Sequence, residues 1–217
     1  LERGVAAARW QGQYLKDLVE ARRSSPQDDL ISHLIDAEEE GERPTAPEMM
    51  AAIATIFTAA GTTTERMISS GLFILLSNRD QFDALRDDRS LMDGALEEIL
   101  RFHHPDQSTS TNRRATQDVE MRGKEIKAGD SVRVSLGAAN RDPVRFPDPD
   151  RFDIRRADNK HLSFGNGIHF CLGSALARSE TEVMFNQVLD EMPGLTLVTD
   201  APIKDPRRPD QIGRAHV

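Results

Sequence analysis

Cysteine is nearly missing from this sequence, which holds one in 217 residues. A single cysteine excludes an internal disulfide framework and any metal site built from several cysteines. No apolar run approaches the roughly 20 residues that cross a bilayer, and no signal peptide is visible. We therefore expect a protein without a membrane segment, in the reducing environment of the cytoplasm.

Basic residues are outnumbered by acidic ones. The 28 lysines and arginines stand against 36 aspartates and glutamates, which gives a formal net charge of −8. Nucleic-acid binding without sequence preference needs a basic surface, so the composition argues against a nucleic-acid partner. The charged share of 29% and the hydrophobic share of 38% are ordinary for a globular protein, and the length suffices for one sizeable core.

The two ends of the sequence look artificial. Leu1 stands where an initiator methionine is expected, and it opens inside an apparently helical stretch. Residues 212–217 read IGRAHV, which is what a widely used sequencing adapter gives when translated in one frame. We interpret residues 1–211 as a single domain and residues 212–217 as a non-native tail.

Hydrophobic periodicity predicts a mainly α protein with a small β-sheet element. Apolar residues at helical spacing indicate helices at Val5–Arg23, Leu30–Glu38, Thr45 to about Ser77, Leu91–His103 capped by Ser90, and Ser174–Met192, with a shorter helix inside residues 78–90. Turn residues around short apolar runs indicate strands at Val119–Met121, Lys124–Ile126, Ser131–Leu136 and Leu195–Val198. We expect the buried face of the last helix to carry Leu172, Ala175, Leu176, Val183, Met184 and Leu189.

The one cysteine lies in a glycine-rich stretch, His161–Gly173, which reads HLSFGNGIHFCLG. Glycines let the backbone take positive φ and approach a ligand closely. The predicted helix that follows favours negative charge at its N-terminal end, which suits a thiolate. An isolated cysteine is more often buried and inert. Three glycines, with Phe164 and His169 around Cys171, favour instead a loop that presents a thiolate to a flat, bulky ligand.

The middle of the long helix contains poor helix formers placed together, Gly61 and the threonines at 62–64. Such violations within a consistent element tend to mark function. Ala60 and Gly61 remove bulk so that a ligand can lie against the backbone, and the hydroxyls of Thr63 and Thr64 can bond the preceding turn or water. The alternative is close helix packing on small residues.

Glu98 and Arg101 lie three residues apart at the edge of an apolar helical arc, within the run EEILRFHHP. At this spacing the two side chains are neighbours and can form an ion pair. Half-burial would make the pair worth more than a surface pair. The alternative is a solvated pair on the helix surface.

These motifs together resemble those of the cytochrome P450 family. The pattern Phe164-Gly165-x-Gly167-x-His169-x-Cys171-x-Gly173 resembles the haem-binding loop of that family. The resemblance implies that the Cys171 thiolate is the ligand of the haem iron and that His169 lies beside a haem propionate. It also implies that Phe164 packs near the sulfur.

The long helix resembles the central helix of the same family, which carries Ala-Gly-x-acid-Thr over the haem. Ala60, Gly61 and Thr64 match that pattern, whereas Thr63 stands where the family has an acid. The resemblance implies that Thr64 hydrogen-bonds oxygen at the distal side. Without that carboxylate the family's usual proton route lacks one of its members. Glu65 is no direct replacement, because adjacent helical positions point about 100° apart.

Two further matches concern arginines. The Glu98-x-x-Arg101 helix resembles a structural motif that the family completes with a later arginine, here Arg156 or, less favoured, Arg155. The resemblance implies a network that locks the core on the haem side. Arg113 matches the position from which the family reaches a haem propionate, with a surface arginine as the alternative; the preceding segment, Pro105–Asn112, is implied to line the substrate pocket.

The resemblance runs from about residue 12 to residue 200 and covers roughly the C-terminal half of the family's fold. It implies a haem-thiolate monooxygenase of the soluble bacterial type, with haem b, that inserts one oxygen atom of dioxygen into a small organic substrate. Electrons are expected from a separate ferredoxin or flavodoxin with its reductase, which a basic patch of Arg113, Arg114, Lys160 and Arg178 could attract. Thr63 favours one alternative, a peroxide-using or non-oxygenase haem-thiolate enzyme. The other is a haem-free binding protein, against which Cys171 speaks.

Overall fold

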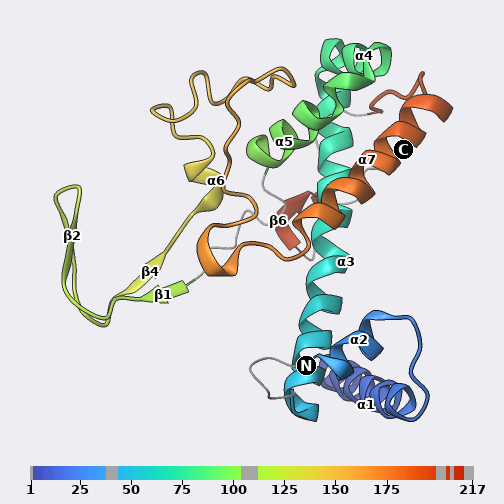
Figure 1. Ribbon diagram of the computed structural model, residues 1–217. Helices are drawn as coiled ribbons and strands as arrows, with labels where there is room; N and C mark the ends of the chain where they lie inside the picture. Colours follow the sequence, from blue (N-terminus) through green and yellow to red (C-terminus); the bar gives the residue numbers. More distant parts are fainter. Residues whose placement is uncertain (1, 38–43, 104–111, 199–203, 206–207, 213–217) are drawn as a thin grey trace. The chain divides into compact units, whose positions relative to one another are not determined.

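The computed structural model describes residues 2–37, 44–103, 112–198, 204–205 and 208–212 (Figure 1). The chain divides into two compact units, residues 1–62 and 63–217, and the boundary falls inside one helix. The prediction of a single domain therefore stays a prediction. Residues 213–217 of the proposed tail lie outside the described residues. No helix in the described part is long and apolar enough to cross a membrane.

The described chain is mainly helical, as predicted, with short two-stranded sheets. The α-helices are α1 (Glu2–Ser24), α2 (Leu30–Asp36), α3 (Ala46–Ser77), α4 (Arg79–Asp87), α5 (Met92–Phe102), α6 (Leu136–Ala139) and α7 (Ser174–Glu191), with 3₁₀ turns η1 (Arg89–Leu91) and η2 (Gly167–His169). The strands are β1 (Asn112–Arg114), β2 (Val119–Met121), β3 (Lys124–Ile126), β4 (Ser131–Arg133), β5 (Lys204–Asp205) and β6 (Arg208–Ile212).

The first unit packs α1 and α2 with the beginning of α3. Its buried core consists of Leu15, Val19, Met49 and Ile53. A capping box starts α3: the Thr45 N–H donates to Glu48 Oε2 at 2.8 Å, and the Glu48 N–H donates to Thr45 Oγ1 at 3.5 Å.

The second unit surrounds the end of α3 with α4, α5 and α7 (Figure 1). Two glycines allow the close approach. A Cβ on Gly71 of α3 would lie 2.7 Å from Phe185 Cζ of α7, and a Cβ on Gly94 of α5 would lie 2.4 Å from the Ile154 carbonyl oxygen. Close packing at these points fixes α3 against α7 and α5 against the irregular segment 140–156.

The strands differ from the predicted single sheet. β2 and β3 form a separate hairpin in which Val119 pairs with Ile126, whereas β4 pairs with β1. The hairpin turns at Arg122 and Gly123, whose φ angles of 50° and 73° suit a two-residue turn. β2 and β3 are joined by a turn of only two residues, so pairing between them is favoured over pairing with a strand that is distant in sequence.

Three local predictions are wrong. Residues 195–198 form no strand, and the Leu195 carbonyl accepts from Arg79 Nη1 at 2.8 Å. Ser90 does not cap α5; its N–H donates to Asp88 Oδ1 at 3.0 Å, and α5 begins later, at Met92.

The third error concerns the buried face of α7. Of the six residues expected on it, only Leu189 is buried, while Leu176 and Val183 are 58% and 65% exposed. The buried residues of α7 are Thr181, Phe185, Val188 and Leu189. Because α7 carries apolar residues on several sides, their spacing does not identify the face that packs against Gly71 of α3.

Candidate functional site

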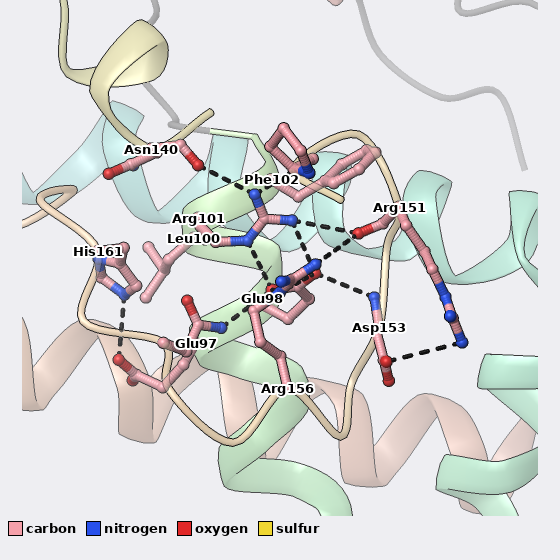
Figure 2. A network of polar contacts seen from close by, with 12 residues as sticks. Glu97, Glu98, Leu100, Arg101, Phe102, Asn140, Arg151, Asp153, Arg156 and His161 are labelled. Atoms are coloured by element: carbon pink, nitrogen blue, oxygen red, sulfur yellow. Dashed lines mark hydrogen bonds and ion pairs between the residues drawn. The ribbon is translucent and has the colours of Figure 1, made fainter. Parts of the chain in front are cut away.

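Glu98 and Arg101 form a fully buried ion pair on α5 (Figure 2). Arg101 Nε donates to Glu98 Oε2 and Arg101 Nη2 to Glu98 Oε1, both at 2.8 Å. Arg156 Nε donates to Glu98 Oε2 at 3.1 Å, so Arg156 rather than Arg155 joins the pair. The carboxylate also accepts from Asn159 Nδ2 and from the Asp153 N–H, each at 3.0 Å. Two guanidinium groups thereby balance the charge of the carboxylate, and both of its oxygens accept hydrogen bonds, as a buried carboxylate requires.

Arg101 also binds main-chain carbonyls of a segment that lacks regular structure. Its Nη1 donates to the carbonyls of Asn140 at 3.0 Å and Pro149 at 2.9 Å, and its Nη2 donates to that of Arg151 at 3.3 Å (Figure 2). The guanidinium thus replaces the hydrogen-bond partners that a strand or helix would supply. The segment 140–156 is held against α5 by this side chain.

Asn140 connects this network to the cysteine loop through hydrogen bonds. Its side chain is fully buried; Nδ2 donates to Ser163 Oγ at 2.8 Å, and Oδ1 accepts from the Leu162 N–H at 2.8 Å. Ser163 Oγ in turn donates to the Leu100 carbonyl at 2.7 Å. Sequence reasoning missed Asn140 and Ser163, because neither belongs to a periodic pattern or a motif.

The cysteine loop turns outward at two glycines. Gly165 and Gly167 have φ angles of 75° and 79°, which other residues rarely adopt. The Cys171 N–H donates to the Phe164 carbonyl at 2.8 Å and closes the loop. Cys171 is exposed just before α7.

The surroundings of Cys171 suit a large apolar ligand. Its neighbours in sequence Ile168, Phe170 and Leu172 are 97%, 52% and 87% exposed. The described residues hold no group of three or more His, Cys, Asp or Glu side chains that could bind a metal ion. A single soft thiolate framed by apolar side chains therefore fits a metal carried by a planar organic cofactor, such as haem, better than a free ion.

A second polar cluster lies at the start of the loop. Arg178 on α7 donates to Glu97 on α5 through Nε at 2.6 Å and through Nη2 at 3.1 Å. His161 Nε2 lies 3.0 Å from Glu97 Oε2, at ion-pair distance (Figure 2). Partial burial raises the pKa of Glu97, but the contacts with His161 and Arg178 outweigh it and hold that pKa at about 2. Sequence reasoning assigned Arg178 to a basic patch and missed Glu97 and His161.

The predicted distal residues lie in the unbroken helix α3. Among the described residues, a Cβ on Gly61 would meet nothing within 4 Å, whereas one on Gly71 would meet the Phe185 ring. Thr64 lines an open groove of about 500 Å³ with residues of α3 and α7, namely Ile68, Ser179, Glu180, Val183 and Met184. Ala60 and Thr63 are exposed on the same helix.

The residues expected to reach haem propionates are on the surface. His169 ends η2 and is exposed. Arg113 lies in β1, where it pairs with Val132 of β4, and its side chain is exposed. Residues 104–111, which include most of the predicted pocket segment, lie outside the described residues.

Comparisons with known proteins identify relatives of this chain. A sequence model of the family described as Cytochrome P450 matches residues 2–202. Cytochrome P450 monooxygenase PikC of Streptomyces venezuelae is 43% identical over 185 residues, which cover 85% of this chain and 44% of PikC. The 6-deoxyerythronolide B hydroxylase of Saccharopolyspora erythraea is 41% identical, with coverage of 90% and 48%.

Solved structures show the same fold. The crystal structure of CYP109E1 from Bacillus megaterium in complex with testosterone is 34% identical and superposes with a TM-score of 0.88, over 94% of this chain and 57% of that one. The chain thus spans about half the length of the relatives that it matches. By its sequence match and its fold, this chain belongs to the cytochrome P450 family.

Proposed function

We propose that the protein that carries this chain is a haem-thiolate monooxygenase. It inserts one oxygen atom from dioxygen into a small organic substrate, with haem b as cofactor and Cys171 as ligand of the iron. The observation that carries the proposal is the exposed Cys171, whose backbone N–H donates to the Phe164 carbonyl and whose neighbours in sequence include exposed apolar side chains. Haem with an axial thiolate supplies dioxygen chemistry, because the thiolate donates electron density that favours O–O cleavage.

The other residues of the loop hold the cofactor in place. Gly165 and Gly173 leave room for a flat ligand close to the backbone. Phe164 packs beneath the loop and fixes the Cys171 amide through its carbonyl. His169 and Arg113 carry exposed side chains suited to propionate carboxylates, and a guanidinium matches carboxylate geometry.

Thr64 is the residue that we propose for the distal proton path. Its hydroxyl can donate to oxygen or hold a water, and Ala60 and Gly61 leave the neighbouring backbone open. Thr63 lacks the carboxyl group that would exchange a proton near neutral pH, so the proton must pass through hydroxyls and the water that they hold. Slow proton delivery favours a second candidate, a haem-thiolate enzyme that uses peroxide, which brings its own protons and electrons.

Electrons come from a separate ferredoxin or flavodoxin with its reductase, in the cytoplasm. Arg113, Arg114 and Lys160 are exposed and can attract an acidic partner. Arg178 is unsuited to this role because Glu97 already neutralises its charge.

The test is expression of the complete gene product and its reduced carbon monoxide difference spectrum. A thiolate-type Soret band that disappears in Cys171→Ser is expected. Absence of the band in the unchanged protein, or its survival in Cys171→Ser, contradicts the proposal. Turnover of macrolactone and steroid probes with dioxygen and a reductase, compared with turnover driven by peroxide, separates the two candidate reactions.

A further inference from the structure

Two side chains from separate segments, His161 and Arg178, meet at Glu97, apart from the Glu98 network. We propose that Glu97, His161 and Arg178 form a positioning network that fixes the Cys171 thiolate and balances the charge beside it. This inference rests on the proposed function, in which Cys171 binds the haem iron. None of the three side chains is assigned a role in the reaction by the motifs above.

The contacts form a short path from α5 to the thiol. Arg178 holds Glu97 with two hydrogen bonds, and its guanidinium carbon lies 4.4 Å from the centroid of the Phe164 ring. A cation at this distance over a ring is attracted by the ring's electrons. Phe164 accepts from the Cys171 N–H at 2.8 Å. Movement of Arg178 therefore reaches the cysteine backbone through one intervening residue.

His161 ties the first residue of the loop to the same carboxylate. Its side chain is 3% exposed, and its Nδ1 accepts from the Ser163 N–H at 3.1 Å. A neutral imidazole that accepts at Nδ1 carries its hydrogen on Nε2, the atom that faces Glu97. Glu97 thus lies within ion-pair distance of residues on both sides of the loop, His161 before it and Arg178 in the helix after it, and is hydrogen-bonded to Arg178.

Glu97 and Arg178 carry opposite charges that balance each other across a distance of 2.6 Å. The hydrogen bond with Glu97 raises the pKa of Arg178, partial burial lowers it, and the charges of Glu97 and Cys171 raise it further. Removing Glu97 would leave an uncompensated positive charge there, and removing Arg178 an uncompensated negative charge. Because reduction adds an electron, a positive charge nearby raises the reduction potential and a negative charge lowers it.

The test uses Glu97→Gln, Arg178→Met and the double variant in the haem-loaded gene product. We expect the potential of the haem to rise in Glu97→Gln, to fall in Arg178→Met and to return toward the wild-type value in the double variant. Arg89→Met is the matched control: Arg89 is 33% exposed, against 35% for Arg178, and also pairs with α7, through Asp190 at 2.7 Å. The control should leave the potential unchanged.

A second measurement needs no haem. Hydrogen exchange of residues 161–173 should be at least about threefold faster in Arg178→Met than in the wild type, since loop opening becomes easier by about 0.7 kcal/mol or more. Arg89→Met should leave exchange in this segment unchanged. Glu97→Asp keeps the charge, so it should show the wild-type potential but lose part of the exchange protection.

The outcomes are distinct. Potentials that shift in the same direction in Glu97→Gln and Arg178→Met, or by no more than in Arg89→Met, overturn the inference and leave the proposed function standing. Unchanged exchange in Arg178→Met also overturns it. If the unchanged protein shows no thiolate-ligated haem, the proposed function and the inference both fail.

Discussion

Removing both members of the buried Glu98–Arg101 pair should cost less stability than the sum of the two single removals. Arg101→Met leaves a carboxylate that is 0% exposed with Arg156 as its remaining cation, and Glu98→Gln leaves a guanidinium that is also 0% exposed without its counter-ion. Breaking a buried pair from one side costs about 3 to 5 kcal/mol. That is a large part of the roughly 5 to 15 kcal/mol by which proteins are stable.

The assay is a double-mutant cycle by equilibrium urea unfolding of the complete gene product. We expect about 3 kcal/mol of destabilisation for Glu98→Gln and about 4 kcal/mol for Arg101→Met, since the latter also releases three main-chain carbonyls. The double variant should be more stable than the sum predicts, by about 2 to 3 kcal/mol.

A matched exposed pair provides the control. Arg145 binds Asp158 through both Nη atoms, at 2.9 and 2.8 Å, with side chains 40% and 64% exposed. The cycle of Arg145→Met and Asp158→Asn should give a coupling energy below about 1 kcal/mol. If the Glu98–Arg101 effects add within about 0.5 kcal/mol, burial of the charges is not the source of the loss and the reasoning is refuted.

Further predictions concern Glu97 and three glycines. The pKa of Glu97 is about 2, below its ordinary 4.5, which stabilises the fold on the order of 2 kcal/mol above pH 4.5. This contribution disappears as the pH falls from 4.5 to 2. The free energies of urea unfolding at pH 7 and at pH 2.5 should therefore differ less in Glu97→Gln than in the wild type. Gly94→Ala should lower the free energy of unfolding by at least about 2 kcal/mol, because its Cβ would meet the Ile154 carbonyl oxygen at 2.4 Å. Gly61→Ala should raise the free energy of unfolding by about 0.5 to 1 kcal/mol, because its Cβ would meet no atom of the described residues within 4 Å. Equal effects of the two substitutions in thermal melts would contradict this. Gly167→Ala, at a φ of 79°, should destabilise the cysteine loop by about 1 kcal/mol, which hydrogen exchange of residues 161–173 would detect; unchanged exchange counts against a backbone role.

Local spacing carries most of what could be predicted from the sequence. The helices follow from hydrophobic period and caps, and the i, i+3 spacing is sufficient to bring Glu98 beside Arg101. The capping box at Thr45 and the hairpin turn at Gly123 are equally local, since a few adjacent residues determine each. Such features need no knowledge of distant contacts.

Long-range pairings could not be predicted in this way. His161 and Arg178 reach Glu97 across 64 and 81 residues, and no period or motif relates them. The buried face of α7 is decided by Gly71 of α3, which admits the Phe185 ring. A helix with apolar residues on several sides offers no local signal for that choice.

The contacts of Arg101 also bear on the order in which the chain folds. Its carbonyl partners lie 39, 48 and 50 residues further along the sequence, and closing such loops costs entropy before any bond forms. We therefore expect α5 to form early and the segment 140–156 to dock late. Stopped-flow measurements should show that substitutions in that segment accelerate unfolding more than they slow folding. The arginine then acts as a latch, whose release opens the irregular segment while the helices persist.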